Sequence, residues 1–498
     1  MLNFNNRFMN KRTWIELAKG TMHHKWVTAC CIGIAGMMAA SCAQDGFDED
    51  EQFVSEVTNA VMASPNSDDI TITASADGKT RTATWPLVKG AGGYLVTVIN
   101  KDLPDEPIVK DSIVDGCSVT FKSEEDVNYL LTIKTLGNAK NNNKDAEQAT
   151  EKNFSTFTPT YAVIPAGSDL KTYFDTNPLP TDKVGEEFNF DLEAGATYTM
   201  SGAVDFGAFQ VTLRTNSKKN NAKIEMTGED AGFILSNGFT LKYLDIDYTK
   251  SNAGLLVMST TPAIEPQEGS SNYFVVTPPI RVMSCNIENL RSHIFYDSSV
   301  KTWLPTTLII DNTVIHLATT VTTIKDQGYI WTNKGNGFIK DLTISNSTVY
   351  NTGEIDVKYF VQYGGMGISN TSFWDKCSIN YTNCTFYEVC KQGQWGNYNG
   401  IQGKKTSYWV MKNCIFYNCS ASGVARRFLH GRGNQATATF ENNTYMKADG
   451  TFDTPTPYDN SGTQIEEDPC FADPANGNFT ISGPTQVARR TGDPRWLP

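Results

Sequence analysis

The sequence is poor in charge, and in positive charge above all. Charged residues make up 19% of its 498 residues, and 54 acidic residues outnumber 42 basic ones, so the formal net charge is −12. Nucleic-acid binding depends mainly on clustered Lys and Arg that neutralise phosphates, and no basic run occurs here. We therefore expect no nucleic-acid partner. The balance also disfavours polyanionic glycans, unless cations or local Arg clusters intervene.

Histidine is scarce as well, and the cysteines lack the spacing of a zinc site. The chain has 5 His and 11 Cys, and no group of them is spaced as zinc ligands are. We therefore expect no resident metal and no other cofactor. Several cysteines fall on a repeat described below, which indicates small buried side chains. A disulfide, for example between Cys390 and Cys419, stays open.

The N-terminal apolar run is too short to cross a membrane. Trp26–Ala40, preceded by Lys25, has about the length of a signal-peptide core, whereas a membrane span needs ~20 apolar residues. The run leads into Ala39-Ala40-Ser41-Cys42, which resembles the lipobox of bacterial lipoproteins. A plain secretory signal cleaved nearby is the alternative, and a start at Met1 or at Met22 stays open.

The lipobox resemblance implies where the protein resides. It implies a signal peptide over residues 1–42 and a lipid on Cys42 that anchors the protein in the outer membrane. Residues 43–66 are polar, acidic and small, and we expect a flexible tether. Within it, Asp45–Glu51 resembles the surface-export signal of Bacteroidetes lipoproteins, although a solvated charged tether has the same composition. We expect an outer-membrane lipoprotein exposed at the cell surface.

Residues 67–160 read as a small β-sandwich. Short alternating strands, such as those around Thr84-Trp85, Tyr94–Ile99 and Tyr129–Thr135, are separated by Gly, Asp and Asn turns. This spacing is typical of an antiparallel sandwich. The residues around Trp85 and Tyr129 resemble a fibronectin type III domain, in which both aromatics are core landmarks. A proline-containing linker is expected over residues 161–185.

A short phrase recurs through the C-terminal half of the chain. Each copy has alternating β-formers, an Asn, a small polar residue or Cys, and more β-branched or aromatic residues, as in Ile344-Ser345-Asn346-Ser347-Thr348-Val349. A strand-like unit repeated every few tens of residues predicts a parallel β-helix in which the Asn side chains form a structural ladder. The Asn positions lie 34, 37, 30 and 29 residues apart, at Asn312, Asn346, Asn383, Asn413 and Asn442.

The C-terminal segment supports the same fold. Asp468–Ile481 and Gly492–Trp496 resemble the closing segment of many pectate-lyase-like proteins, which implies a right-handed parallel β-helix over residues 186–498. The whole layout resembles Bacteroidetes surface lipoproteins of an uncharacterised family, in which a fibronectin-like domain precedes such a β-helix. That resemblance implies a role in polysaccharide utilisation. We assume a monomer.

Candidate ligand contacts lie on loops that leave the repeats at equal phase. Two loops begin 8 residues after their Asn, at Lys391 and Ala421, and such loops stack beside each other. Aromatic faces with Arg and amides between them suit sugars. The aromatics could instead fold inward as loop anchors. The expected glycan-binding residues are Trp331, Tyr363, Trp395, Tyr398, Arg426 and Arg427.

Two functions compete on this evidence. The first is a non-catalytic surface that captures polysaccharide, which we favour because catalytic patterns of the fold are missing. The second is a polysaccharide lyase or, less strongly, a glycoside hydrolase, for which no catalytic residue is assigned. β-Elimination needs a base and a neutralised carboxylate, so Ca²⁺ would be involved only in a lyase. The residues that could serve a lyase are Arg426, Arg427, His430, Arg432 and Lys404.

Overall fold

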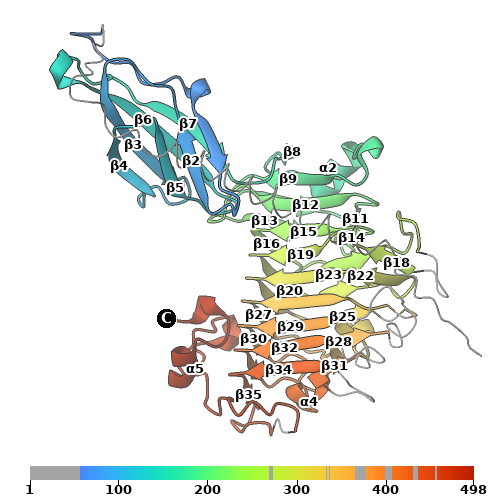
Figure 1. Cartoon of the computed structure of the whole chain (residues 1–498). Coiled ribbons are helices and arrows are strands. Elements are labelled where there is room, and N and C mark those ends of the chain that lie inside the picture. The colour runs from blue at the N-terminus through green and yellow to red at the C-terminus, as the bar shows by residue number, and fades with distance from the viewer. Residues whose placement is uncertain are drawn as a thin grey trace, which may run out of the picture.

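The protein is built almost entirely of β-strands (Figure 1). The computed structural model describes residues 57–498 apart from 268–272, 333, 336, 365–376, 399–406, 430–435 and 455–456. Small antiparallel sheets come first, and three long parallel sheets follow, stacked as in a parallel β-helix. The expected all-β architecture is confirmed. Cys42 and the expected signal peptide lie outside the described residues. No helix within the described ranges is long and apolar enough to cross a membrane.

The N-terminal domain is a sandwich of a three-stranded and a four-stranded sheet. Its core holds Trp85 and Tyr94, whose rings meet edge to face at 5.4 Å, and also Tyr129. The strands are β1 (Thr71–Ala74), β2 (Thr80–Thr84) and β5 (Ser118–Lys122) in one sheet, and β4 (Val109–Val114), β3 (Ala91–Asn100), β6 (Asn128–Gly137) and β7 (Thr150–Ser155) in the other.

Part of the expected tether belongs to this sandwich. The backbone N–H groups of Asn59 and Met62 donate to the carbonyls of Asn141 and Lys144, each at 3.0 Å. Residues 57–66 therefore lie against the loop before β7 rather than extending freely.

The β-helix is formed by three parallel sheets, which the chain visits in a fixed order from β9 to β31. The first sheet contains β8 (Ala162–Ile164), β9 (Glu187–Leu192), β12 (Gln210–Thr215), β15 (Phe239–Lys242), β19 (Ile280–Met283), β23 (Thr307–Asp311), β26 (Asp341–Ser345), β29 (Ser378–Thr382), β32 (Tyr408–Lys412) and β34 (Thr437–Glu441). The second contains β10 (Thr197–Met200), β13 (Ala222–Met226), β16 (Leu244–Asp247), β20 (Asn286–Leu290), β24 (Val314–Leu317), β27 (Thr348–Asn351), β30 (Thr385–Tyr387), β33 (Ile415–Tyr417) and β35 (Thr444–Met446). The third contains β11 (Val204–Asp205), β14 (Phe233–Leu235), β17 (Leu256–Met258), β21 (Phe295–Tyr296), β25 (Gly328–Thr332), β28 (Tyr359–Tyr363) and β31 (Gln394–Asn397). A further pair, β18 (Tyr273–Val276) and β22 (Thr302–Pro305), lies outside these sheets.

The repeated Asn residues turn the chain from the first sheet into the second. All five have a positive φ of 48–53°, a left-handed conformation that Asn adopts more readily than most residues. The Asn383 amide donates to Asn346, that of Asn413 to Asn383 and that of Asn442 to Asn413, each at 3.1 Å. The predicted ladder is confirmed from Asn346 to Asn442, where it holds neighbouring coils in register. Asn312 does not join it, because its amide donates to Ser284 and that of Asn346 donates to Asp311.

Small thiols fill the positions beside the ladder. Cys384 and Cys414 are fully buried, and Cys285 is 1% exposed. Burial raises the pKa of the Cys285 thiol to about 12. All eight cysteines in the described ranges are free, Cys390 and Cys419 included. The six buried ones act as small core residues, whereas Cys117 is half-buried and Cys470 is exposed.

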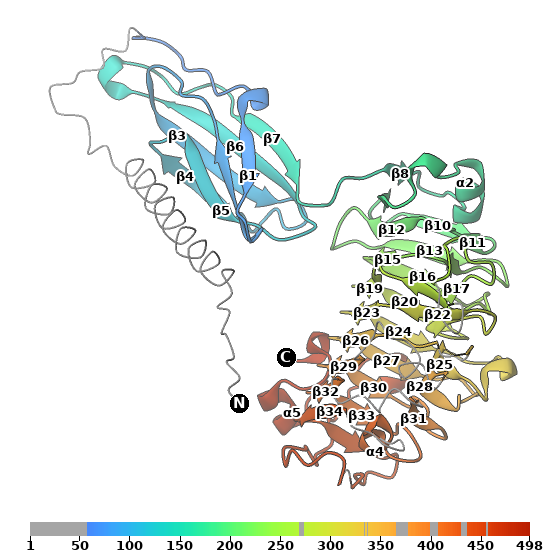
Figure 2. The same ribbon diagram turned by 45° about the vertical axis from the view of Figure 1, so that its right-hand side comes forward.

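Both ends of the β-helix are covered by its own chain (Figure 2). Residues 161–185, expected to be a linker, instead carry β8, which pairs with β9, and helix α2 (Leu170–Thr176), which packs on β10 and β11. The solenoid therefore begins about 25 residues earlier than its sequence pattern indicates.

The closing segment lies along the outer side of the second sheet and its Asn turns. Fully buried Asp493 accepts a hydrogen bond from the Thr348 hydroxyl at 2.8 Å. The indole N–H of Trp496 donates to the same hydroxyl at 2.8 Å. Phe479 packs edge to face on Tyr350 and Tyr387. Helix α5 (Pro484–Arg489) belongs to this segment.

The two domains meet through buried polar contacts. Asp126, 6% exposed, accepts hydrogen bonds from the Lys242 ammonium at 2.6 Å and from the Tyr243 hydroxyl at 2.9 Å. The guanidinium of Arg214 lies 4.9 Å from the centre of the Phe157 ring. The junction thus joins the loop before β6 and the end of β7 to the outer side of the first sheet.

Candidate functional site

The stacked loops lead to a helix that replaces a strand of the third sheet. After β33 the chain does not form another strand of that sheet, but turns into helix α4 (Val424–Leu429), which packs against β31. Val424, Ala425 and Phe428 point into the core, and Arg426 is left exposed. The amphipathic pattern of this short helix therefore places Arg426 at the end of the third sheet.

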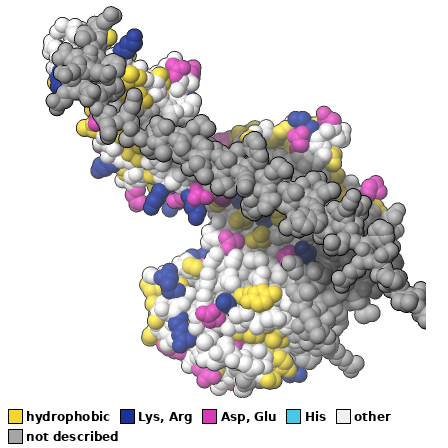
Figure 3. Space-filling model, in the orientation of Figure 1, with side chains coloured by type: hydrophobic (Ala, Val, Ile, Leu, Met, Phe, Trp, Pro, Cys, Tyr) yellow, Lys and Arg dark blue, Asp and Glu magenta, His cyan; other side chains and the backbone are white. Residues whose placement is uncertain are grey.

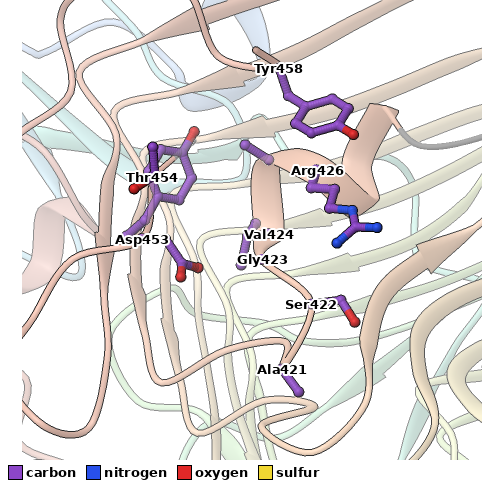
Figure 4. Close-up of a pocket in the computed structure, with 10 residues that line it drawn as sticks. Ala421, Ser422, Gly423, Val424, Arg426, Asp453, Thr454 and Tyr458 are labelled. Atoms are coloured by element: carbon purple, nitrogen blue, oxygen red, sulfur yellow. The ribbon is translucent and has the colours of Figure 1, made fainter. Parts of the chain in front are cut away.

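Arg426 lines a cavity of about 400 Å³. In Figure 4, Arg426 and Tyr458 stand on one side, and Asp453 and Thr454 lie across the cavity from them. Asp453 and Tyr458 are half-buried, so their positions are fixed while their polar atoms stay accessible. The cavity therefore offers a cationic donor, a carboxylate acceptor and an aromatic ring to one small ligand.

The charges at the cavity are only partly compensated. The Asp453 carboxylate is paired with the Lys447 ammonium at 3.2 Å, whereas no carboxylate of the described residues lies within ion-pair distance of Arg426. Burial, with the positive charge of Arg426 beside it, lowers the pKa of Arg427. The helix thus presents two neighbouring cations in a protein that is acidic overall.

A second recess of about 270 Å³ adjoins the cavity and shares Ala421 and Asp453 with it. Its walls include Lys391, Lys447 and Asp449. The Lys391 ammonium is paired with Glu388 at 2.9 Å. Cavity and recess together form a cleft lined by both cationic and anionic side chains. Such donors and acceptors suit a ligand rich in hydroxyl groups.

Four of the predicted sugar-stacking residues do not reach the surface. Tyr363 and Trp395 are 0% exposed, Tyr398 is 1% exposed and Trp331 is 7% exposed. Trp395 stacks on Phe360 at 4.4 Å within the main core. A ring without an exposed face cannot stack on a sugar, so the structure corrects the expected surface role of these residues. The inward-folding alternative, which concerned Trp331, Trp395 and Tyr398, describes Trp395 and Tyr398 in the main core, whereas Trp331 is buried outside that core.

The other predicted residues divide into two groups. Arg426 is exposed and lines the cleft. Arg427, the next residue of α4, is half-buried beside it. Lys404, His430 and Arg432 lie outside the described residues. In the part of the chain that is described, no group of three or more His, Cys, Asp or Glu side chains could hold a metal ion.

Asp453, Thr454 and Tyr458 are cavity residues that the sequence pattern did not single out. Asp453 follows Asn442 by 11 residues, close to the phase at which the loops at Lys391 and Ala421 leave their coils. A search for a loop at a similar distance after Asn442, the Asn of the last repeat, would therefore have pointed to Asp453. Tyr458 carries no such signal, because it lies beyond the repeats.

The charges on the visible face of the β-helix do not form one dominant patch. On the face shown in Figure 3, Lys and Arg alternate with Asp and Glu over the β-helix. The cleft at α4 is distinguished by its shape and by Arg426, which has no ion-pair partner among the described residues.

Three family models match the chain, and each is described as a domain of unknown function. DUF4992 matches residues 26–196, DUF4957 matches residues 196–352 and DUF5123 matches residues 379–496. The first covers the sandwich and the start of the β-helix, and the third contains the whole cleft at α4. No curated protein matches the chain.

Proposed function

We propose that this chain is a cell-surface lipoprotein that captures polysaccharide in a cleft at the end of its β-helix. The observation that carries the proposal is the cavity in which Arg426 and Tyr458 lie across from Asp453. Guanidinium and carboxylate groups can hold adjacent sugar hydroxyls from opposite sides, and the tyrosine ring can cover an apolar sugar face. Arg426 could also pair with an acidic sugar.

Features outside the cleft support a location at the cell surface. The lipobox at Cys42, the acidic run that follows it and the fibronectin type III-like sandwich would hold the pectate-lyase-like β-helix away from a membrane. The resemblance to Bacteroidetes surface lipoproteins implies that the captured polysaccharide is a nutrient.

A second candidate, a polysaccharide lyase, is favoured by one observation. The pKa of Arg427 is lowered first by burial and then by the charge of Arg426, which is the direction that a general base requires, and Arg427 lies next to Arg426 of the cavity wall. Ca²⁺ would belong only to this reaction. A hydrolase is less well supported, since hydrolysis uses two facing carboxyl groups and Asp453 is the one carboxylate among the residues lining the cavity.

The experiment is retention and cleavage measured side by side. The lipid-free chain, residues 43–498, is incubated with immobilised neutral and acidic plant and host polysaccharides, with and without Ca²⁺. We expect retention on at least one of them, and Arg426→Ala to lose it while Lys412→Ala, on the outer side of the first sheet, keeps it. If the wild type forms an ultraviolet-absorbing unsaturated uronate and Arg427→Ala does not, the lyase proposal replaces the capture proposal. Retention unaffected by Arg426→Ala would overturn the proposed cleft.

A further inference from the structure

A second opening lies on the third-sheet side of the β-helix, several coils before α4. It is a groove of about 470 Å³ that spans β14, β17 and β21 and the turn before β25. Its walls include Asn252, His293, Tyr296 and Gln327. None of these residues lines the cleft at Arg426.

Tyr296 supplies the groove with a braced aromatic ring. Its position on β21 is in register with Val257 on β17 and Trp331 on β25, and its side chain is half-buried. The His293 ring stacks on it at 4.3 Å and 10°. His293 is 3% exposed and lies 2.7 Å from the Gln327 amide oxygen through Nε2. The tyrosine ring is therefore held in one orientation before any ligand arrives.

Glycines beside the ring let the coils that form the groove pack closely. A Cβ atom on Gly232 would lie 2.9 Å from the Ala253 Cβ, and one on Gly254 would lie 3.1 Å from a Val257 methyl. Side chains at these positions would therefore clash with neighbouring parts of the chain, so glycine is needed at the starts of β14 and β17, two of the strands that form the groove.

The groove is nearly uncharged. Asp230 is the one ionised residue among those that line it, and it is exposed at the rim. Burial lowers the pKa of His293 to about 4, so this ring is neutral at pH 7. The hydrogen-bonding groups are amides and hydroxyls, among them Asn252, Thr323 and Gln327. A uronate or a sulfate would find no cation here, and an uncharged polyol would find both donors and acceptors.

We propose that this groove binds an uncharged pyranose segment of a polysaccharide, stacked on Tyr296 with its hydroxyls toward Asn252 and Gln327. This proposal goes beyond the proposed function, because the groove is a separate subsite from the cleft at Arg426 and prefers uncharged ligands. Strands β25, β28 and β31 separate β21 from α4, a distance of ~19 Å at ~4.8 Å per strand. A polysaccharide chain that spans this distance and reaches both sites would gain avidity.

The test uses soluble hexasaccharides of glucose, mannose, xylose and galactose, with hexagalacturonate as the acidic probe. Binding to the lipid-free chain is measured by calorimetry. We expect at least one neutral hexasaccharide to bind, Tyr296→Ala to weaken it about tenfold or more, and Tyr296→Phe to stay within about threefold because the ring remains. Asn252→Ala, which leaves the stack intact, should weaken the same ligand about threefold to tenfold. Thermal melts confirm that each variant is folded.

The outcomes separate the two sites. Neutral binding that depends on Tyr296 and is unchanged in Arg426→Ala supports this groove even if the cleft at α4 fails its own test. Retention that depends only on Arg426, with equal affinity in Tyr296→Ala, overturns the groove and leaves the proposed function standing. Absence of neutral binding across the four probes also overturns it.

Discussion

Single asparagines carry the register of the solenoid, and each combines two roles that can be separated. Asn383 holds a left-handed backbone conformation with φ of 53°. Its side chain also donates to Asn346 and accepts from Asn413. Glycine can replace the first role without replacing the second.

The matched pair Asn383→Ala and Asn383→Gly measures both roles. We expect Asn383→Ala to lower the free energy of unfolding by about 3 kcal/mol, from two lost ladder bonds and a left-handed alanine. Asn383→Gly should cost about 2 kcal/mol, because only the bonds are lost. Denaturant unfolding followed by circular dichroism gives both values. Equal stability of Asn383→Ala and the wild type would show that the ladder does not contribute to the stability of the fold.

His293 makes stability depend on pH. Its folded pKa is about 4 because it is buried, whereas an unfolded histidine has a pKa of about 6.5. Between these values the unfolded chain binds more protons, so stability is lost as pH falls from about 6.5 toward 4. At pH 5 the histidine term should cost about 2 kcal/mol relative to pH 7. The pH slope of unfolding free energy should be smaller in His293→Gln, and identical slopes in both proteins would contradict the assignment.

At the scale of the element, the repeat was predictable and the direction of its side chains was not. The Asn phrase fixed which residues begin the second sheet, because few residues accept a left-handed turn. Trp395 and Tyr398 stand in a glycine-rich stretch that has no clean alternation, so nothing in the pattern told inside from outside. Cavity residues such as Tyr458 come from a segment without a repeat. For that reason, more of the fold than of the candidate site could be predicted from the sequence.

The closing segment was also predictable as an element, but the surface that it covers was not. Its attachment depends on Asp493, which is fully buried and bonded to Thr348 and to the Thr385 hydroxyl through its backbone N–H. We expect Asp493→Ala to lower the free energy of unfolding by about 3 kcal/mol, because the buried Thr348 hydroxyl loses a charged acceptor and Arg495 loses its ion-pair partner. Glu466→Ala, on an exposed side chain of the same region, should change it by less than about 0.5 kcal/mol. Thermal melts of the two variants compare them directly, and similar melting temperatures would refute the role of Asp493.

At the scale of the molecule, the junction decides whether the sandwich is a flexible spacer or a fixed arm. Asp126 is nearly buried and bonded to Lys242 and Tyr243, so the two domains should keep one relative orientation. Breaking such a pair leaves a charge without its partner, at a cost of about 3 kcal/mol. That is enough to release a contact between two domains of one chain.

Small-angle scattering tests this arrangement. The wild type should fit a single orientation of the two domains, whereas Asp126→Ala should require a spread of orientations. Asp115→Ala, an exposed change on the same sandwich, should scatter like the wild type. A flexible wild type, or an unchanged Asp126→Ala profile, would mean that the junction does not fix the arm.

The closing segment has a mechanical consequence for a protein that is pulled by a long ligand. A solenoid alone is a series of coils, each held only to its neighbours, so tension along the axis opens its weakest joint. Here Arg489 donates to Asn442 and Arg495 donates to Asn312, so one segment of chain spans the coils between them as a tie rod. To separate any two of those coils, a pulling force must also detach the closing segment from them. The coils that end in the Arg426 cleft should therefore fail together at a high force, while the unbraced coils ahead of them yield first.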